Sequence, residues 1–169
     1  EKIIDLKGRK IKQSFSVTNE ETPRIIDPRN AFIMTSLLKE VINTGTARKA
    51  KSLKREDIAG KTGTTNELVD AWFAGFNPDM VTITWMGFDQ PKSLGKHESG
   101  SRAALPIWID YMRPIIGEYP TKIVETPDGI IPLRINPKNG MLANKDEDSI
   151  YEYFYDEFPP SDNAYFLLN

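Results

Sequence analysis

The hydrophobic positions follow two spacings, and each spacing predicts a different element. Intervals of three and four residues predict a helix over about residues 28–44, with its apolar stripe at Met34, Leu37, Leu38, Val41 and Ile42. Asp27 and Pro28 suit an N-cap and a first helical turn, and Gly45 is expected to end the helix in a left-handed conformation. The same intervals predict a second helix from about Ala103, with its stripe at Leu105, Ile109, Met112 and Ile116.

Between these helices the spacing falls to two residues, which is typical of strands. We expect strands at about 57–65, 70–77 and 81–89, and their short polar connections require antiparallel pairing. Large apolar side chains alternate along the second and third strands. We assign the two sets to opposite faces, Trp72, Ala74 and Phe76 on one and Val81, Ile83 and Trp85 on the other. The predicted fold class is therefore α+β, an antiparallel sheet covered by helices on both sides.

The two ends of the chain differ from this middle part. Residues 1–20 predict a hairpin that turns at Gly8, and beyond Tyr119 frequent prolines leave only residues 130–135 as a clear strand. The net charge of -2 divides unevenly, because residues 121–169 carry 4 basic and 9 acidic side chains against 18 and 15 in residues 1–120. We therefore expect a folded part, 1–120, and an acidic, partly ordered appendage, 121–169.

Composition and charge narrow the classes of function. The chain is 39% apolar, enough for one core, and no apolar run is long enough to cross a membrane. The basic run at 48–55 lacks interleaved aromatic residues, so it is expected to be a solvated connection and not a nucleic-acid surface. The absence of cysteine excludes disulfides and thiol catalysis. Because the chain opens at Glu1 without a signal-like segment, it is either cytoplasmic or an excerpt, and we favour the excerpt.

Candidate chemistry lies where the first strand reaches Gly60-Lys61-Thr62-Gly63-Thr64. Strand alternation places the hydroxyls of Thr62 and Thr64 on one side and Lys61 on the other, and Gly63 leaves room for a ligand. A carboxylate lying along the strand would find two hydroxyl donors, a nearby ammonium and free N–H groups. The same letters also suit an ordinary strand that leads into a threonine-rich turn.

Gly60-Lys61-Thr62 also matches the end of a nucleotide-binding phosphate loop. That motif needs a glycine at position 55 and a helix directly after the Lys-Thr pair. Position 55 is Arg, and the alternating residues from Ala71 onward predict a strand. The surrounding sequence therefore disfavours a nucleotide-binding function.

The segments that follow add three further motifs, Asp70-Ala71-Trp72-Phe73-Ala74-Gly75-Phe76, Thr84-Trp85-Met86-Gly87-Phe88-Asp89 and Ala104-Leu105-Pro106-Ile107-Trp108. Together with Lys61-Thr62-Gly63-Thr64, the series resembles the C-terminal portion of the transpeptidase domain of class A penicillin-binding proteins. The resemblance implies the serine β-lactamase/penicillin-binding transpeptidase fold. It also implies a D,D-transpeptidase that cross-links peptidoglycan stem peptides ending in D-Ala-D-Ala and that binds β-lactams.

The resemblance also assigns roles at the site and implies partners. Thr62, Gly63 and Thr64 would bind substrate, Lys61 would act electrostatically, and the backbone N–H of Thr64 would contribute to the oxyanion hole. No cofactor or metal is implied. The expected partners within the protein are the upstream half of the same domain and a glycosyltransferase domain. The expected location is the extracytoplasmic side of the bacterial cytoplasmic membrane, with an anchor outside this chain.

A nucleophile is not evident in this chain. Ser36 and Lys39 have the Ser-x-x-Lys spacing, but only 21 residues separate Lys39 from Lys61, too few for the helices that lie between these motifs in the family. Ser161-Asp162-Asn163 has the letters of Ser-x-Asn but follows Lys61 instead of preceding it. We interpret both as chance matches and expect the nucleophile elsewhere. His97, the sole histidine, is expected in an exposed loop.

The sequence leaves three alternative functions open. A serine β-lactamase or a D,D-carboxypeptidase of the same superfamily would carry the same Lys-Thr-Gly strand. A non-catalytic peptide-binding module would explain the missing nucleophile. A nucleotide-binding protein is the least favoured of the three.

Overall fold

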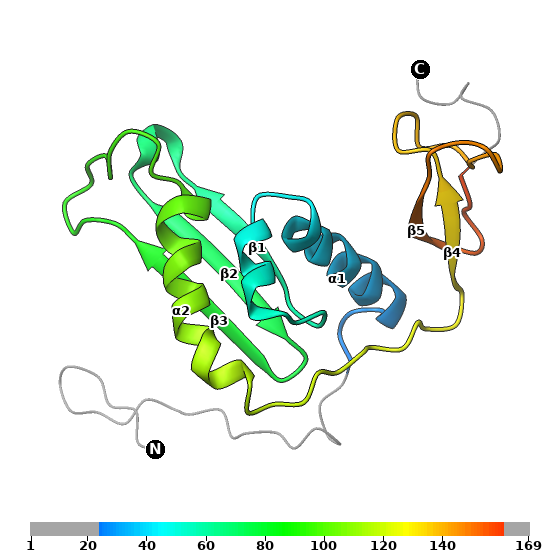
Figure 1. The fold of residues 1–169 in the computed structure, drawn as a ribbon, viewed down its shortest axis with the longest axis horizontal. Coiled ribbons are helices and arrows are strands. Elements are labelled where there is room, and N and C mark those ends of the chain that lie inside the picture. Colours follow the sequence, from blue (N-terminus) through cyan, green and yellow to red (C-terminus); the bar gives the residue numbers. More distant parts are fainter. Residues whose placement is uncertain (1–23, 161–169) are drawn as a thin grey trace.

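The computed structural model describes residues 24–160, so the hairpin predicted for residues 1–20 and the serine at position 161 lie outside the described part. The regular elements, shown in Figure 1, are α1 (Pro28–Asn43), β1 (Ala59–Thr64), β2 (Ala71–Asn77), β3 (Met80–Met86), α2 (Leu105–Ile116), β4 (Ile130–Ile135) and β5 (Ile150–Tyr155). Two 3₁₀ turns, Arg48–Leu53 and Asn66–Leu68, flank β1, and a π-helical turn, Gly100–Ala104, leads into α2.

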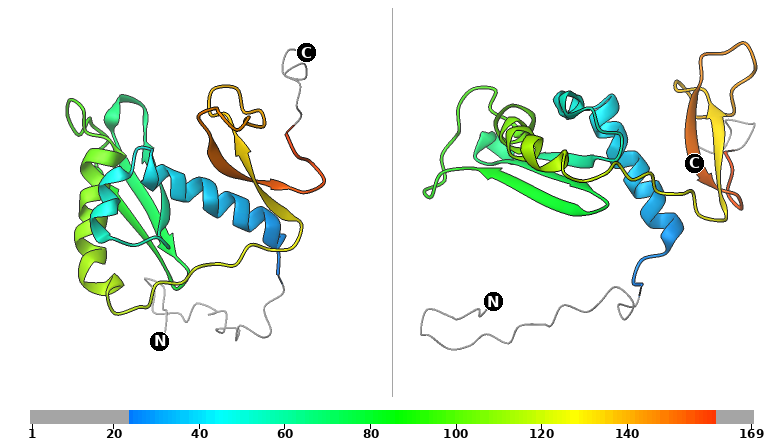
Figure 2. Two further views of the ribbon diagram at one scale, coloured as in Figure 1. Left: turned by 45° about the vertical axis from the view of Figure 1, so that its right-hand side comes forward. Right: turned by 60° about the horizontal axis from the view of Figure 1, so that its bottom comes forward.

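The strands β1, β2 and β3 form an antiparallel sheet in that order. The three predicted strands and both predicted helices are therefore confirmed, with ends that differ by a few residues. Figure 2 shows α2 lying against one face of this sheet. The α+β prediction is confirmed as a fold class.

The hydrophobic core lies between α2 and the sheet. Trp108 of α2 is fully buried, meets the ring of Phe73 edge-on with centroids 5.0 Å apart, and donates its indole N–H to the carbonyl of Thr82. A Cβ at Gly75 would lie 2.5 Å from the Trp108 ring, so only glycine lets the ring approach β2 this closely. Truncating a buried tryptophan typically costs about 3–5 kcal/mol, which makes this contact a principal support of the α2 position.

The opposite face of the sheet is open in the described residues. The register pairs Trp72 with Trp85 and Ala74 with Ile83, so side chains that we assigned to opposite faces share one face. Trp72 is 42% exposed, Ile83 61% and Trp85 46%. The prediction that helices cover both faces was wrong for residues 24–160. Spacing within one strand does not reveal which faces of neighbouring strands coincide, because that depends on register.

The helix α1 begins as predicted and ends differently. The carboxylate of Asp27 accepts a hydrogen bond from the backbone N–H of Arg29 at 2.8 Å, which caps the first turn. Gly45 does not adopt the expected left-handed conformation. A Cβ at Gly45 would lie 2.9 Å from the backbone of Val41, so the glycine is required by close packing against the last helical turn.

The basic segment after α1 is not simply a solvated connection, because Arg55 is nearly buried. Its side chain is 9% exposed and that of Asp57 is 1% exposed. The guanidinium binds both carboxylate oxygens of Asp57, at 2.8 and 2.6 Å, and donates to the carbonyls of Ile116 and Tyr119. Arg55 therefore joins the start of β1 to the C-terminal end of α2.

The strands β4 and β5 form a second, antiparallel hairpin, which an extended segment connects to α2. The strand predicted at 130–135 is confirmed. The hairpin and the residues that follow it contact α1 through aromatic and charged side chains. The rings of Phe32 and Tyr153 meet edge-on 4.9 Å apart, and Arg29 forms an ion pair with Glu157 at 2.7 Å.

Candidate functional site

The Lys61–Thr64 segment lies on an edge strand. Within residues 24–160, β1 pairs with β2 alone, so the other edge of β1 has no strand partner there. Lys61 and Thr64 are exposed, and Thr62 and Gly63 are partly exposed. An edge with free backbone groups and hydroxyl side chains is suited to an extended ligand.

Lys61 lies close to its own strand. Its ammonium donates a hydrogen bond to the carbonyl oxygen of Thr62 at 2.9 Å. Strand alternation directs the first carbons of Lys61 and Thr62 to opposite faces, and the long side chain curls back to reach the neighbouring residue. The positive charge therefore lies at the backbone of Thr62 despite the alternation.

A hydroxyl from the turn after α1 contacts Thr62. The Oγ1 atoms of Thr46 and Thr62 are 2.7 Å apart, a hydrogen bond in which either hydroxyl could be the donor. Thr46 is held near β1 because Ala47 beside it is fully buried and its N–H donates to the carbonyl of Val41 at 2.9 Å. No motif or spacing around Thr46 singles it out as a site residue.

Thr64 is held in a similar way by the π-helical turn before α2. The backbone N–H of Gly100 donates to Oγ1 of Thr64 at 3.0 Å. Gly100 is buried against the strands, and a Cβ added to it would lie 2.4 Å from the carbonyl oxygens of both Gly63 and Trp72. The close approach of this backbone to β1 therefore requires glycine at position 100.

The connection after β1 excludes a phosphate loop. β1 continues through Lys61, Thr62 and Thr64 as a strand, and a short 3₁₀ turn follows it where that motif needs a helix. The turn is closed by Thr65, whose hydroxyl accepts from the N–H of Asp70 at 2.8 Å. The sequence-based rejection of a nucleotide-binding loop is thus supported by the local geometry.

Two known proteins that are similar to this chain have the same name. Penicillin-binding protein 1A of Pseudomonas aeruginosa is 48% identical over 162 residues, which are 94% of this chain and 20% of that protein. Penicillin-binding protein 1A of Neisseria lactamica is 48% identical over 132 residues, 78% of this chain and 16% of that protein. The chain belongs to the penicillin-binding protein family.

Solved structures agree with this assignment. A crystal structure of penicillin-binding protein 1A from Haemophilus influenzae matches with a TM-score of 0.76 at 30% identity, over 95% of this chain and 29% of that one. No family model matches the sequence. The chain spans about a fifth of the length of the curated penicillin-binding proteins it matches, so the activity of a whole penicillin-binding protein does not transfer to it directly.

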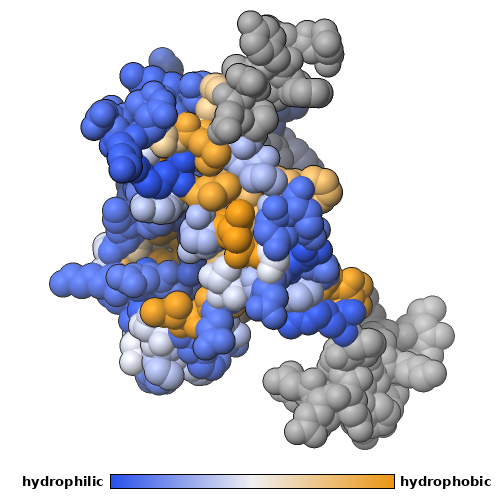
Figure 3. All heavy atoms as spheres, turned by 90° about the vertical axis from the view of Figure 1, so that its right-hand side faces the viewer, coloured by the Kyte–Doolittle hydropathy of each residue, from blue (hydrophilic) through white to orange (hydrophobic). Residues whose placement is uncertain are grey.

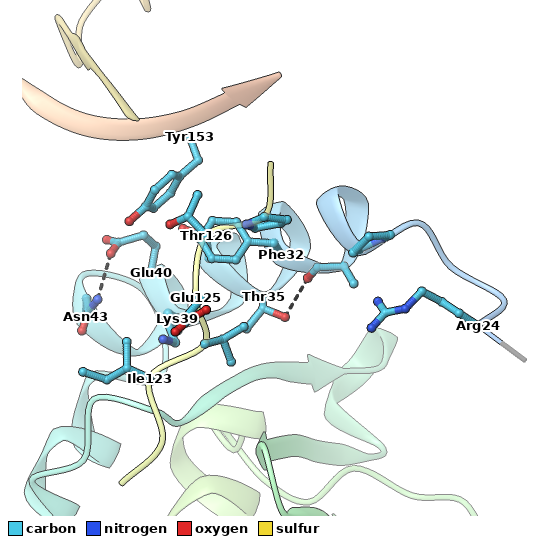
Figure 4. Close-up of a pocket in the computed structure, with 15 residues that line it drawn as sticks. Arg24, Phe32, Thr35, Lys39, Glu40, Asn43, Ile123, Glu125, Thr126 and Tyr153 are labelled. Carbon is cyan, nitrogen blue, oxygen red and sulfur yellow. Dashed lines mark hydrogen bonds between the residues drawn. The ribbon is translucent and has the colours of Figure 1, made fainter. Parts of the chain in front are cut away.

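Ser36 and Lys39 lie in another part of the molecule. Both line a groove of about 570 Å³ between α1 and the segment 123–127, and no residue of β1 lines it. Figure 4 shows Lys39 beside Glu125 and Tyr153 above the helix, and Figure 3 shows apolar side chains among hydrophilic ones on the face that includes the hairpin. Burial and the nearby carboxylate of Glu40 raise the pKa of Glu152 on β5.

The described residues offer little support for a site built on His97 or on a metal ion. His97 is exposed and has a φ of +74° in the loop before Ser99. Residues 24–160 contain no group of three metal-binding side chains, and no helix among them is long and apolar enough to span a bilayer. The roles assigned to Lys61, Thr62, Gly63 and Thr64 stay predictions.

Proposed function

We propose that this chain is the carboxylate-binding part of a serine-type peptidoglycan D,D-transpeptidase, which β-lactams also acylate. The observation that carries the proposal is the edge strand β1, where Lys61, Thr62 and Thr64 meet on a border without a strand partner in the described residues. A stem peptide ending in D-Ala-D-Ala is an extended chain with a terminal carboxylate. It would add along this border, and the two threonine hydroxyls would donate to its carboxylate.

The nucleophile in this proposal is a serine outside the chain. Its oxygen attacks the carbonyl carbon of the penultimate D-alanine, the bond to the terminal D-alanine breaks, and that D-alanine leaves with the serine proton. An amine of a neighbouring stem peptide then attacks the ester, forms the cross-link and returns a proton to the serine. The backbone N–H of Thr64 would be one oxyanion donor, a contact whose loss typically costs about 3 kcal/mol. Lys61 would support proton transfer through a second serine, also outside the chain.

The open face of the sheet is where we expect the rest of the transpeptidase domain to pack. Lys61 pairs with Ala74, and Ala74 pairs with Ile83, so Lys61 shares a face with the exposed Trp72 and Trp85. The relatives are about five times as long as the chain, which supplies a segment to cover this face. Packing there would bury apolar surface and bring the missing nucleophile to the face that carries Lys61. We assign a glycosyltransferase domain, a membrane anchor and an extracytoplasmic location to the remainder of the protein.

Labelling with a fluorescent penicillin tests the proposal. We expect covalent labelling of the full-length protein and none of residues 1–169 alone. Thr62→Val and Thr64→Val should each slow labelling by about tenfold, because each removes a hydrogen bond to a charged group. The matched control is Thr44→Val, since the Thr44 hydroxyl bonds back to Glu40 in the α1 helix and does not contact β1. Labelling of the isolated chain at Ser36 would overturn the placement of the nucleophile elsewhere.

The fate of the acyl group separates the remaining alternatives. A transpeptidase passes it to an added amine, whereas a D,D-carboxypeptidase passes it to water, and a β-lactamase rapidly hydrolyses the penicillin itself. A non-catalytic peptide-binding module would bind the peptide reversibly and acquire no label. Release of D-alanine with and without an acceptor amine, together with hydrolysis of penicillin, therefore assigns one of the four when both are measured on the full-length protein.

A further inference from the structure

Both substrate-facing hydroxyls of β1 are held by groups that lie outside the Lys-Thr-Gly motif. Thr62 bonds to the hydroxyl of Thr46 at 2.7 Å, and Thr64 accepts from the N–H of Gly100 at 3.0 Å. The two supports come from separate parts of the chain, one after α1 and one before α2. Both supports contact β1, one at Thr62 and the other at Thr64.

The direction of each hydrogen bond decides where the threonine protons point. A backbone N–H can only donate, so the oxygen of Thr64 is an acceptor toward Gly100 and its own proton is directed elsewhere. A hydroxyl has one proton and two lone pairs, so Thr62 can donate to a ligand only if Thr46 is the donor between them. A carboxylate accepts and cannot donate. A bound carboxylate therefore requires the Thr46 proton to point at Thr62.

We infer that Thr46 and Gly100 are positioning residues that orient the hydroxyl protons of Thr62 and Thr64 toward the carboxylate of the peptide or β-lactam, an inference that rests on the proposed function. Neither residue touches the ligand. Thr46 acts through its side chain, so serine can replace it. Gly100 acts through its backbone and through the absence of a Cβ, so alanine cannot replace it without moving the π-helical turn away from Gly63.

The test uses the full-length protein and a matched pair of penicillins, one with its free carboxylate and one with that carboxylate esterified. For Thr46→Val we expect the second-order acylation rate with the free acid to fall about five- to tenfold and the rate with the ester to change less than about twofold. Thr46→Ser should restore the rate with the free acid. Thr44→Val, on the same turn but directed at α1, should change neither rate.

The outcomes separate this inference from the proposed function. If wild-type protein is not acylated by either penicillin, the proposed function fails and the inference fails with it. If wild-type protein is acylated and Thr46→Val slows both penicillins equally, or slows neither, the positioning role of Thr46 is overturned while the proposed function stands.

Gly100 is tested by a double-mutant cycle. In a protein with Thr64, Gly100→Ala should slow acylation by the free acid about tenfold. In a protein that already has Thr64→Val, the same substitution should slow it much less, because the effect passes through the Thr64 hydroxyl. The control is Gly117→Ala, since a Cβ at Gly117 meets no atom within 4 Å. Equal effects of Gly100→Ala in both backgrounds would overturn its positioning role, and so would a protein with unchanged rates. Should Gly100→Ala fail to fold, unaltered acylation of Thr64→Ser would support the hydroxyl as the group that Gly100 orients, and acylation of Thr64→Val at the wild-type rate would overturn it.

Discussion

The rings of Trp72 and Trp85 lie 6.0 Å apart across the β2–β3 pair, on the sheet face that also carries Lys61. The indole N–H of Trp85 donates to the carboxylate of Asp70 at 2.8 Å, which fixes the orientation of that ring. Trp108, on the other face, is fully buried. The sheet therefore has one face packed by α2 and one face whose large apolar side chains are half exposed in the described residues.

The open face leads to a prediction about stability. Ile83 is 61% exposed here, yet Ile83→Ser should lower the free energy of unfolding of the full-length protein by about 2 kcal/mol, because we expect this side chain to be buried there. Ile123→Ser, at an 80% exposed position in the segment before β4, is the control and should change it by less than about 0.5 kcal/mol. Urea unfolding of both variants makes the comparison. Equal, small effects would show that nothing packs on this face.

Arg55 supplies a second prediction, because its removal leaves a nearly buried carboxylate unpaired. Arg55→Met should cost about 3–5 kcal/mol in the free energy of unfolding, since Asp57 is 1% exposed and loses both guanidinium hydrogen bonds. Arg48→Met, at an exposed position in the 3₁₀ turn, should cost less than about 0.5 kcal/mol. A cost below about 1 kcal/mol for the Arg55 variant would contradict a structural role for the pair.

The same pair predicts a dependence on pH. Burial raises the pKa of Asp57, but the hydrogen bonds from Arg55 and from the backbone N–H of Lys122 outweigh burial and lower the pKa below 3.8. Because the folded state holds the proton less tightly than the unfolded state, this stabilisation is fully present above about pH 3.8 and is lost as the pH falls through the folded pKa. Thermal unfolding between pH 2 and 6 should show a shallower loss for Asp57→Asn than for wild type. Parallel curves would contradict the assignment.

A further prediction concerns Arg29, whose side chain attaches the β4–β5 hairpin to α1. The guanidinium bonds to Glu157 at 2.7 Å and lies 4.8 Å from the ring centroid of Tyr155, and its hydrogen bond lowers the pKa of Glu157 to about 2. Arg29→Ala should therefore release the hairpin and speed proteolytic cleavage within the exposed segment 121–126. Arg24→Ala, at an exposed position before α1 that forms no hydrogen bond or ion pair with residues 24–160, is the control. Equal cleavage of both variants would place the attachment elsewhere.

The spacing of hydrophobic residues predicted the helices and strands well, but it did not predict which residues of different helices and strands are in contact. The stripes on α1 and α2 and the alternation on β2 follow from residues close in sequence, and these elements form where expected. The face shared by Trp72 and Trp85 depends on register, and the contacts of Arg55 join segments 61 and 64 residues apart. Thr46 and Gly100 reach β1 only after the chain has folded. No periodicity within one element carries that information.

The proposed function depends on the free edge of β1 binding the carboxylate of an extended peptide. A crystal structure of the full-length protein acylated by a penicillin tests it most directly. We expect the penicillin carboxylate within about 3.2 Å of Oγ1 of both Thr62 and Thr64, and the acylated serine on a segment outside residues 1–169. A carboxylate bound elsewhere, or a β1 edge paired with another strand of the protein, would contradict it.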